Sequence, residues 1–266
     1  MNTQPIGLFD SGIGGTSIWK EVIKLLPNEN TLYLADSKNA PYGEKSSDEI
    51  IALSVKNTEY LLSKGCKLIV VACNTATTNA IDYLRATYNV PFIGIEPAIK
   101  PAALFSKTGA IGILATKGTL SSKLFEKTAN EYTKNITKIE QDGEGLVPLI
   151  EAGKINSPQL INLLTTYLKP MLNFNIDHLV LGCTHYPYLI PQIQQILGEQ
   201  VKIIDSGEAV AKQTKAILEK NNLLNTLPKS AIKQPTHQLF SNININVLAQ
   251  LIKDVPVQYA VEKLDF

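Results

Sequence analysis

The chain has only three cysteines, Cys66, Cys73 and Cys183, and no two of them form a CxxC pair. An odd number of widely spaced cysteines does not suit a disulfide framework, and a structural zinc site needs four closely spaced ligands. Free thiols of this kind are either small buried apolar groups or reactive nucleophiles. The sequence therefore predicts a protein of a reducing compartment with no bound metal. The surroundings of each thiol decide whether it is a buried apolar group or a reactive nucleophile.

The chain also lacks the features of membrane, secreted and nucleic-acid-binding proteins. No apolar run approaches the roughly 20 residues that cross a bilayer, and the N-terminus has no basic region followed by an apolar stretch. The 25 basic and 24 acidic residues form no block of like charge, which disfavours a broad basic face for nucleic acid. We expect a cytoplasmic protein with neither membrane nor nucleic-acid partners.

Short apolar runs alternate with helical patterns along the 266 residues. The runs are rich in β-branched residues with little polar alternation, which is typical of strands covered on both faces. They span residues 5–9, 31–35, 67–72, 91–95, 110–114, 136–139, 178–182 and 201–204. Residues 46–63 and 159–172 have the apolar spacing of helices, and a weaker strand at 237–240 precedes a short helix. This alternation predicts an α/β fold with largely parallel sheets.

Two parts of the sequence resemble one another. The segment LIVVACNTATTNA contains Cys73, and its counterpart HLVLGCTHYPYLI contains Cys183, 110 residues later. A second pair of segments, around Glu96 and Asp205, and a third pair that includes the first strand lie at nearly the same offset. We interpret the pattern as two related α/β halves. The alternative is a chance likeness between generic strand–loop–helix units.

Cys73 and Cys183 each follow directly after a predicted strand, whereas Cys66 lies just before one. In open α/β sheets, ligands bind beyond the carboxyl ends of the strands. Backbone N–H groups and the helix dipole at such a position lower the pKa of a thiol. We therefore expect Cys73 and Cys183 to be reactive and Cys66 to be structural. Two thiols on opposite faces of one carbon could invert its configuration, because one removes a proton and the other returns one.

Polar residues close to the strand ends are candidates for substrate binding. Asp10 opens the glycine-rich turn DSGIGG, which lacks the spacing of a phosphate-binding loop and reads equally as a tight strand-to-helix turn. Asn74, Thr75 and Thr184 directly follow the two cysteines. Small polar groups at such turns either hold carboxylates or cap helices, and the sequence alone leaves both roles open.

His185 lies two residues after Cys183 and could tune that thiol or be structural. Glu151, in the segment LVPLIEAGKI, could be a helper or a solvated helix residue. A Cys–His hydrolase or acyltransferase is one alternative, although its histidine is usually distant in sequence and the second cysteine has no role there. A one-cysteine decarboxylase and a non-enzymatic, two-lobed amino-acid-binding protein are the others.

Six motifs resemble those of glutamate racemases in the aspartate/glutamate racemase superfamily. They occur in the family's order between residues 5 and 220, and read IGLFDSGIGG, ADSKNAPYGEKS, VACNTATT, GIEPAIKPA, LIEAG and VLGCTHYP. Aspartate racemases share the two cysteines but usually carry an acidic residue in place of the histidine of GCTHYP. The chain departs from many relatives at Ser37, Lys38 and Asn39, and its tail from about Pro228 matches poorly.

The resemblance implies two pseudo-twofold-related three-layer α/β domains with the active site between them. Residues 1–96 plus 207–266 would form the first domain and residues 97–206 the second. The implied activity is interconversion of L- and D-glutamate, which supplies peptidoglycan synthesis, by a homodimer that uses neither pyridoxal phosphate nor any other cofactor or metal.

The resemblance also assigns residues. Cys73 would act on the D-enantiomer and Cys183 on the L-enantiomer, with assistance from Asp10, His185 and Glu151. The substrate-binding positions would be Asp10, Ser11, Tyr42, Gly43, Asn74, Thr75, Thr116, Thr119, Thr184 and His185.

Overall fold

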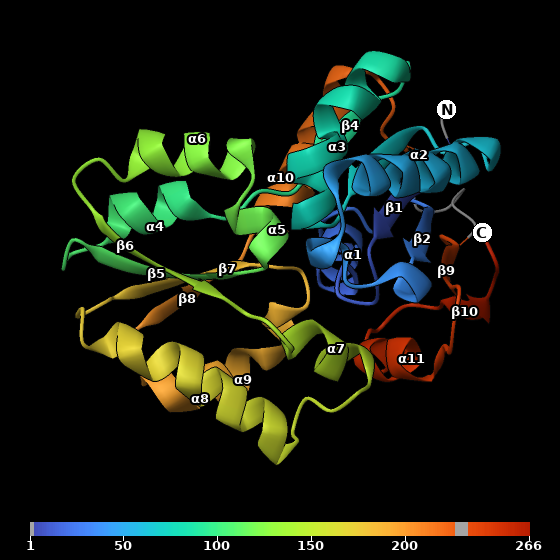
Figure 1. Ribbon diagram of the computed structural model, residues 1–266. Coiled ribbons are helices and arrows are strands. Elements are labelled where there is room, and N and C mark those ends of the chain that lie inside the picture. The colour runs from blue at the N-terminus through green and yellow to red at the C-terminus, as the bar shows by residue number, and fades with distance from the viewer. Residues whose placement is uncertain (1–2, 227–233) are drawn as a thin grey trace.

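Two parallel β-sheets lie side by side in the computed structural model, which describes residues 3–226 and 234–266 (Figure 1). The first sheet has the order β10-β9-β2-β1-β3-β4 and the second the order β6-β5-β7-β8. The strands of the first sheet are β1 (Ile6–Asp10), β2 (Thr31–Ala35), β3 (Leu68–Val71), β4 (Phe92–Gly94), β9 (His237–Ser241) and β10 (Ala260–Lys263). Those of the second are β5 (Ala110–Ala115), β6 (Thr137–Asp142), β7 (His178–Gly182) and β8 (Lys202–Ile204).

Helices cover both faces of each sheet, so each half has three layers (Figure 1). One face of the first sheet packs against α1 (Thr16–Leu25), α10 (Gly207–Lys220) and α11 (Asn246–Ile252), and the other against α2 (Ser47–Ser63) and α3 (Asn74–Thr87). One face of the second sheet packs against α4 (Ile99–Phe105) and α6 (Lys123–Tyr132), and the other against α7 (Leu146–Glu151), α8 (Pro158–Leu172) and α9 (Ile190–Leu197). The predicted parallel α/β fold is confirmed.

The topology of the two sheets repeats. The strand order β2-β1-β3-β4 in the first sheet corresponds to β6-β5-β7-β8 in the second. Cys73 follows the end of β3 after one residue, and Cys183 directly follows β7, so the two thiols occupy corresponding places. The internal repeat interpreted from the sequence therefore corresponds to a repeat in the fold.

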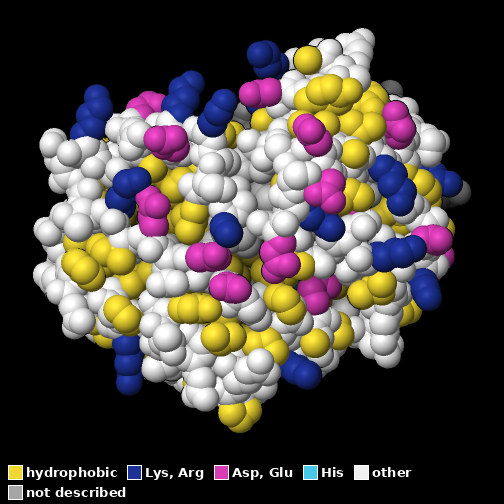
Figure 2. Space-filling model, viewed as in Figure 1, with side chains coloured by type: hydrophobic (Ala, Val, Ile, Leu, Met, Phe, Trp, Pro, Cys, Tyr) yellow, Lys and Arg dark blue, Asp and Glu magenta, His cyan; other side chains and the backbone are white. Residues whose placement is uncertain are grey.

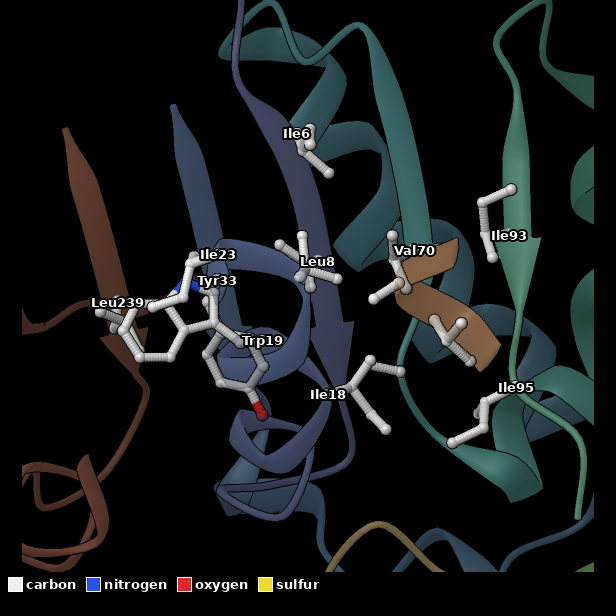
Figure 3. Packing of buried hydrophobic residues seen from close by; sticks show 14 of the residues in the cluster. Ile6, Leu8, Ile18, Trp19, Ile23, Tyr33, Val70, Ile93, Ile95 and Leu239 are labelled. Atoms are coloured by element: carbon white, nitrogen blue, oxygen red, sulfur yellow. The ribbon is translucent and has the colours of Figure 1, made fainter. Parts of the chain in front are cut away.

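Neighbouring residues of the central strands face different cores, which explains their uninterrupted apolar runs. In the core shown in Figure 3, Leu8 of β1 and Val70 of β3 lie on the side of α1, whose Trp19 is fully buried. Residue Phe9, next along β1, belongs to the opposite core under α2 and α3. Burial of each such side chain contributes about 1.5 to 3 kcal/mol to stability. Packing on both faces therefore fixes the strand ends that carry the polar residues.

The C-terminal segment completes the first sheet. The strand β9 pairs in parallel with β2, with Thr31 opposite His237, and Leu239 joins the core around Trp19 (Figure 3). We propose that the chain divides where its cores divide, into residues 1–96 plus 207–266 and residues 97–206. The cores around Trp19 and under α2 draw their residues from the first set, and the two cores of the second sheet draw theirs from the second.

Most predicted elements are found within a residue or two of their expected bounds. The helix expected at 46–63 begins with a capping box, in which Ser46 and Glu49 bond each other's backbone N–H groups. The edge strand β10 was not predicted, and Pro228 lies outside the described residues. Among the described residues, no helix is both long and apolar enough to cross a membrane.

A buried ion pair links the residue before β3 to the residues before β2 in the first half. Lys67 Nζ lies 2.6 Å from Glu29 Oε2, with side chains only 1% and 2% exposed, and the other Glu29 oxygen accepts from Asn225 N–H at 2.7 Å. Replacing Lys67 by Met leaves Glu29 charged and buried without this partner, so we expect a loss of about 3 to 5 kcal/mol in the free energy of unfolding. Urea denaturation measures it.

The matched control is Lys212→Met. Its ion pair with Glu208 is exposed, and removing such a pair costs about 1 kcal/mol or less. An equal loss of unfolding free energy in the two variants would show that the buried pair stabilises the fold no more than an exposed pair does.

Candidate active site

The two thiols from the equivalent strand ends line one small buried cavity. Cys73 caps the N-terminus of α3, where its Sγ accepts from Ala76 N–H at 3.4 Å, and Cys183 lies between β7 and the short helix η3 (Tyr186–Leu189). Eight further predicted residues line the same cavity: Ser11, Tyr42, Gly43, Asn74, Thr75, Thr116, Thr184 and His185. Residues 110 positions apart thus meet at the contact between the halves.

The cavity holds about 10 Å³, the space of roughly one water molecule. A larger hollow of about 730 Å³ adjoins it and shares Pro41, Gly43, Thr116 and Val147 with it. On the face viewed in Figure 1, acidic side chains gather near the middle, between the halves (Figure 2). The cavity has no room for a ligand much larger than water, and the larger hollow lies directly beside it.

Cys183 has an acid–base partner in His185. Its Sγ lies 3.7 Å from His185 Nδ1, and His185 Nε2 lies 2.6 Å from Glu151 Oε1. Nε2 also lies 3.2 Å from the backbone N of Gly14. In the tautomer that donates from Nε2 to the Glu151 carboxylate, Nδ1 is left to exchange a proton with the thiol. Burial alone would lower the pKa of His185, but the contacts with Cys183 and Glu151 outweigh burial and raise it. The arrangement can accept a proton from Cys183 and stabilise the resulting imidazolium.

The glycine-rich turn after β1 is a close-packing element. Ile13 N–H donates to Glu151 Oε1 at 2.7 Å. A Cβ at residue 12 would collide with the Glu151 carboxylate, and one at residue 14 with the His185 ring. These glycines therefore let Glu151 and His185 of the other half approach the backbone of the first. The segment DSGIGG thus forms the tight strand-to-helix turn, and the turn also packs against the second half.

Asp10 is the ionisable side chain beside Cys73. It is fully buried, its Oδ2 accepts from Gly15 N–H at 2.7 Å, and Thr184 Oγ1 of the other half lies 3.3 Å from both carboxylate oxygens. Burial raises the pKa of Asp10 to about 6, against the opposing charge of His185. A carboxyl group of this pKa, within hydrogen-bonding reach of Cys73, can take or give a proton near neutral pH.

The expectation of a lowered thiol pKa is wrong for Cys73. Burial and the charge of Asp10 raise its pKa far above the ordinary value, although the bond from Ala76 N–H acts in the opposite direction. Removing a thiolate from water costs more than one helix N-terminus returns. Both effects favour the neutral thiol of Cys73 over the thiolate. Burial also raises the pKa of Cys66, to about 12, and its sulfur lies against the backbone of Gly7.

Asn74 has the clearest mark of a ligand-binding side chain. Both polar atoms of its amide are buried, and neither has a hydrogen-bond partner among the described residues. Such groups are costly unless a ligand or water completes them. The hydroxyl of Tyr42, by contrast, is bound to Asp36 Oδ2 at 2.5 Å, so contact with a ligand at residues 42 and 43 would come from the backbone.

The other predicted residues fall into two places. Thr75 Oγ1 and Thr116 Oγ1 lie 2.9 Å apart and join the halves at the cavity wall. Thr119 lies behind that wall and contacts both hydroxyls. Asp10 and Glu151 likewise contact lining residues from behind. The full predicted set is therefore brought together, in an inner layer at the cavity and an outer layer that supports it.

Sequence reasoning missed the residues that act through distant contacts. Ser37 Oγ donates to Glu151 Oε2 at 2.8 Å across 114 positions of sequence, and the sequence interpretation noted Ser37 only as a departure from relatives. Val147 and Pro41 line the cavity but lie in ordinary apolar or loop settings. The nearness of Ser37 to PYG was the only available signal.

Comparison with known proteins agrees with this geometry. Residues 14–214 match the family model Asp/Glu/Hydantoin racemase. The chain belongs to this racemase family. A glutamate racemase of Herpetosiphon aurantiacus is 46% identical over 225 residues, which cover 85% of this chain and 89% of that protein.

Solved racemase structures share the fold over the whole chain. A glutamate racemase isoform from Bacillus anthracis has a TM-score of 0.86 and 30% identity and covers 100% of this chain and 99% of its own. The Escherichia coli glutamate racemase, solved with L-glutamate and an activator, has a TM-score of 0.84 and 32% identity, with 98% of each chain covered. The predicted enzyme class, an amino-acid racemase, is confirmed.

The burial of Asp10 in this racemase has a testable cost. Its pKa rises from 3.8 to about 6 on folding, so folding favours the protonated carboxyl and loses that advantage as pH rises through 6. We expect Asp10→Asn to be more stable than the wild type at pH 8 by up to about 3 kcal/mol. The gain should shrink through pH 6 and vanish below pH 4. Urea denaturation at pH 4, 6 and 8 measures it, and a variant less stable at pH 8 would contradict it.

Proposed function

We propose that the protein interconverts L- and D-glutamate with two thiols, Cys183 and Cys73, one of which removes the α-proton while the other donates a different proton to the opposite face. The observation that carries the proposal is the cavity lined by both thiols, one from each half. Inversion needs a base on one side of a carbon and an acid on the other. The similarity to glutamate racemases, among them the one solved with L-glutamate, supports the choice of substrate.

In the L-to-D direction the reaction starts at Cys183. His185 Nδ1 takes the thiol proton, with Glu151 stabilising the imidazolium through Nε2. The Cys183 thiolate then removes the α-proton of L-glutamate, and the neutral thiol of Cys73 donates a proton to the opposite face. The C–H bond that forms replaces the one that breaks, so no oxidant, reductant or co-reactant is consumed.

In the D-to-L direction the roles reverse. Asp10 lies within hydrogen-bonding reach of Cys73, so its carboxylate form is the group placed to take the Cys73 proton. The resulting thiolate removes the α-proton of D-glutamate, and Cys183 returns a proton from the other side. Each thiol has its own partner, which suits an enzyme that must start from either enantiomer.

The α-proton of an amino acid is only weakly acidic, so the carbanion-like transition state needs electrostatic support. Among the described residues, no lysine or arginine lines the cavity. The substrate carboxylates would instead be held by N–H groups at the start of α3 and by the amide of Asn74 and the hydroxyls of Thr75 and Thr184. Exclusion of water strengthens each of these bonds.

The wider role follows from the same resemblance. We infer a cytoplasmic homodimer that supplies D-glutamate for peptidoglycan synthesis and needs no pyridoxal phosphate. Light scattering tests the dimer, and loss of D-glutamate dependence in a host that lacks its own racemase tests the supply role.

The activity is tested with purified protein whose absorbance spectrum shows no pyridoxal. We expect L-glutamate to lose its circular dichroism signal while deuterium enters the α-carbon in D2O. The aspartate control should remain unchanged. Change with aspartate alone would keep the chemistry and move the substrate, and no exchange with either amino acid would refute the proposed activity.

The cysteine roles are tested by Cys73→Ser and Cys183→Ser. Each direction needs one base and one acid, so we expect either change to lower kcat by at least about 100-fold in both directions, in the range of general acid–base effects. Cys66→Ser is the matched control, because its thiol lies outside the cavity. Full activity in the Cys73 variant would remove that residue from the mechanism.

A further inference from the structure

Ser37 bridges the two halves at the carboxylate of Glu151. It begins the short helix η1 (Ser37–Asn39) directly after β2 and Asp36, and its Oγ donates to Glu151 Oε2 at 2.8 Å. The other oxygen, Oε1, accepts from His185 Nε2 and Ile13 N–H. The carboxylate therefore accepts from Ser37 and Ile13 of the first half and contacts His185 of the second. The bond at Oε2 comes from Ser37.

The bond from Ser37 influences the charge and orientation of Glu151 because both side chains are largely buried from solvent. Ser37 is 8% exposed and the Glu151 side chain 12% exposed. Burial alone would raise the pKa of Glu151, but the bonds from His185, Ile13 and Ser37 outweigh burial and keep it below the ordinary value. A donor to a buried carboxylate favours the charged form and also fixes the plane of the group.

The backbone on both sides of Ser37 is fastened independently. Asn242, which follows β9, donates to Asp36 Oδ1 at 2.6 Å and accepts from Lys38 N–H at 2.8 Å. The other oxygen of Asp36 accepts from Tyr42. Residues 36 and 38 are thus tied to the C-terminal segment, which holds the Ser37 hydroxyl at one place rather than on a free loop.

We propose that Ser37 is a positioning residue, which orients Glu151 so that its Oε1 meets His185 and His185 in turn meets Cys183. The proposal rests on the proposed racemase function. Ser37 lines no part of the cavity, so it acts through Glu151 and touches no reacting atom.

The test compares Ser37→Ala with Ser37→Thr, which keeps the hydroxyl, and with Ser63→Ala, whose exposed hydroxyl bonds only its own helix. We expect Ser37→Ala to lower kcat/KM for both glutamate enantiomers by about 10- to 100-fold, the size seen when a partner that orients a reactive group is lost. KM should change less than threefold. Ser37→Thr and Ser63→Ala should stay within threefold of wild type.

Two further readouts separate positioning from a merely structural role. In a Glu151→Gln background, Ser37→Ala should add less than a twofold further loss, because the two residues act as a unit. The acid limb of the pH profile of kcat/KM should shift to higher pH in Ser37→Ala, since loss of the donor raises the Glu151 pKa. The ionisable groups facing Glu151 are His185, Asp10 and Tyr33, and all remain in the variant.

A measurement without turnover keeps this proposal distinct from the function it rests on. Carbon-13 NMR of labelled glutamate side chains, assigned with Glu151→Gln, reports the Glu151 pKa directly in wild type and in Ser37→Ala. An unchanged pKa together with unchanged kcat/KM overturns the role of Ser37. A wild type that racemises neither glutamate nor aspartate overturns the proposed function instead, while the NMR shift still tests the contact. If Ser37→Ala does not fold, Ser37→Gly and the Thr variant carry the same comparison.

Discussion

The turn after β1 lies directly against Glu151 and His185 of the other half, and the geometry at both thiols depends on that contact. Asp10, the last residue of β1, accepts from Thr184 beside Cys183, and the Ile13 N–H in the turn donates to Glu151. The strand end and the turn thus contact the polar groups beside both thiols. Small residues are required because backbone and side chains meet at van der Waals distance.

The fold repeats, but the chemistry at its two equivalent points differs. Cys73 has a carboxyl partner and Cys183 an imidazole partner. Both pKa values are raised, but for different reasons: burial raises that of the Asp10 carboxyl, whereas the contacts with Cys183 and Glu151 outweigh burial and raise that of the His185 imidazole. In the proposed mechanism, the asymmetry lets either thiol begin the reaction. It also carries a cost, because ionised Asp10 opposes folding, the kind of trade that active sites commonly show.

The sequence predicts the fold well because the signals are local. Buried parallel strands appear as short β-branched runs, and the repeat around the cysteines places both thiols at equivalent strand ends before any contact is known. The edge strand β10 could not be predicted because Ala260–Lys263 is short and partly exposed and contains no apolar run. The positions of Asp10, Asn74 and His185 could be predicted from their nearness to strand ends and from family resemblance.

What could not be predicted depends on contacts between distant residues. The direction of the Cys73 pKa shift is set by burial and by the charge of Asp10, which no local sequence pattern records. The bond from Ser37 to Glu151 and the packing of Gly14 on His185 each join residues more than 100 positions apart. A serine in a loop and a glycine in a turn look ordinary until the halves are brought together.

The central claim is that two thiols work from opposite sides of one carbon, and the location of solvent deuterium tests it most directly. L-glutamate is converted in D2O and stopped after a small fraction has reacted, and both enantiomers are separated and analysed by mass. The account predicts deuterium at the α-carbon of the D-glutamate formed, while the remaining L-glutamate keeps its proton. Deuterium appearing in L-glutamate as fast as in D-glutamate would point to one shared base and contradict the two-thiol mechanism.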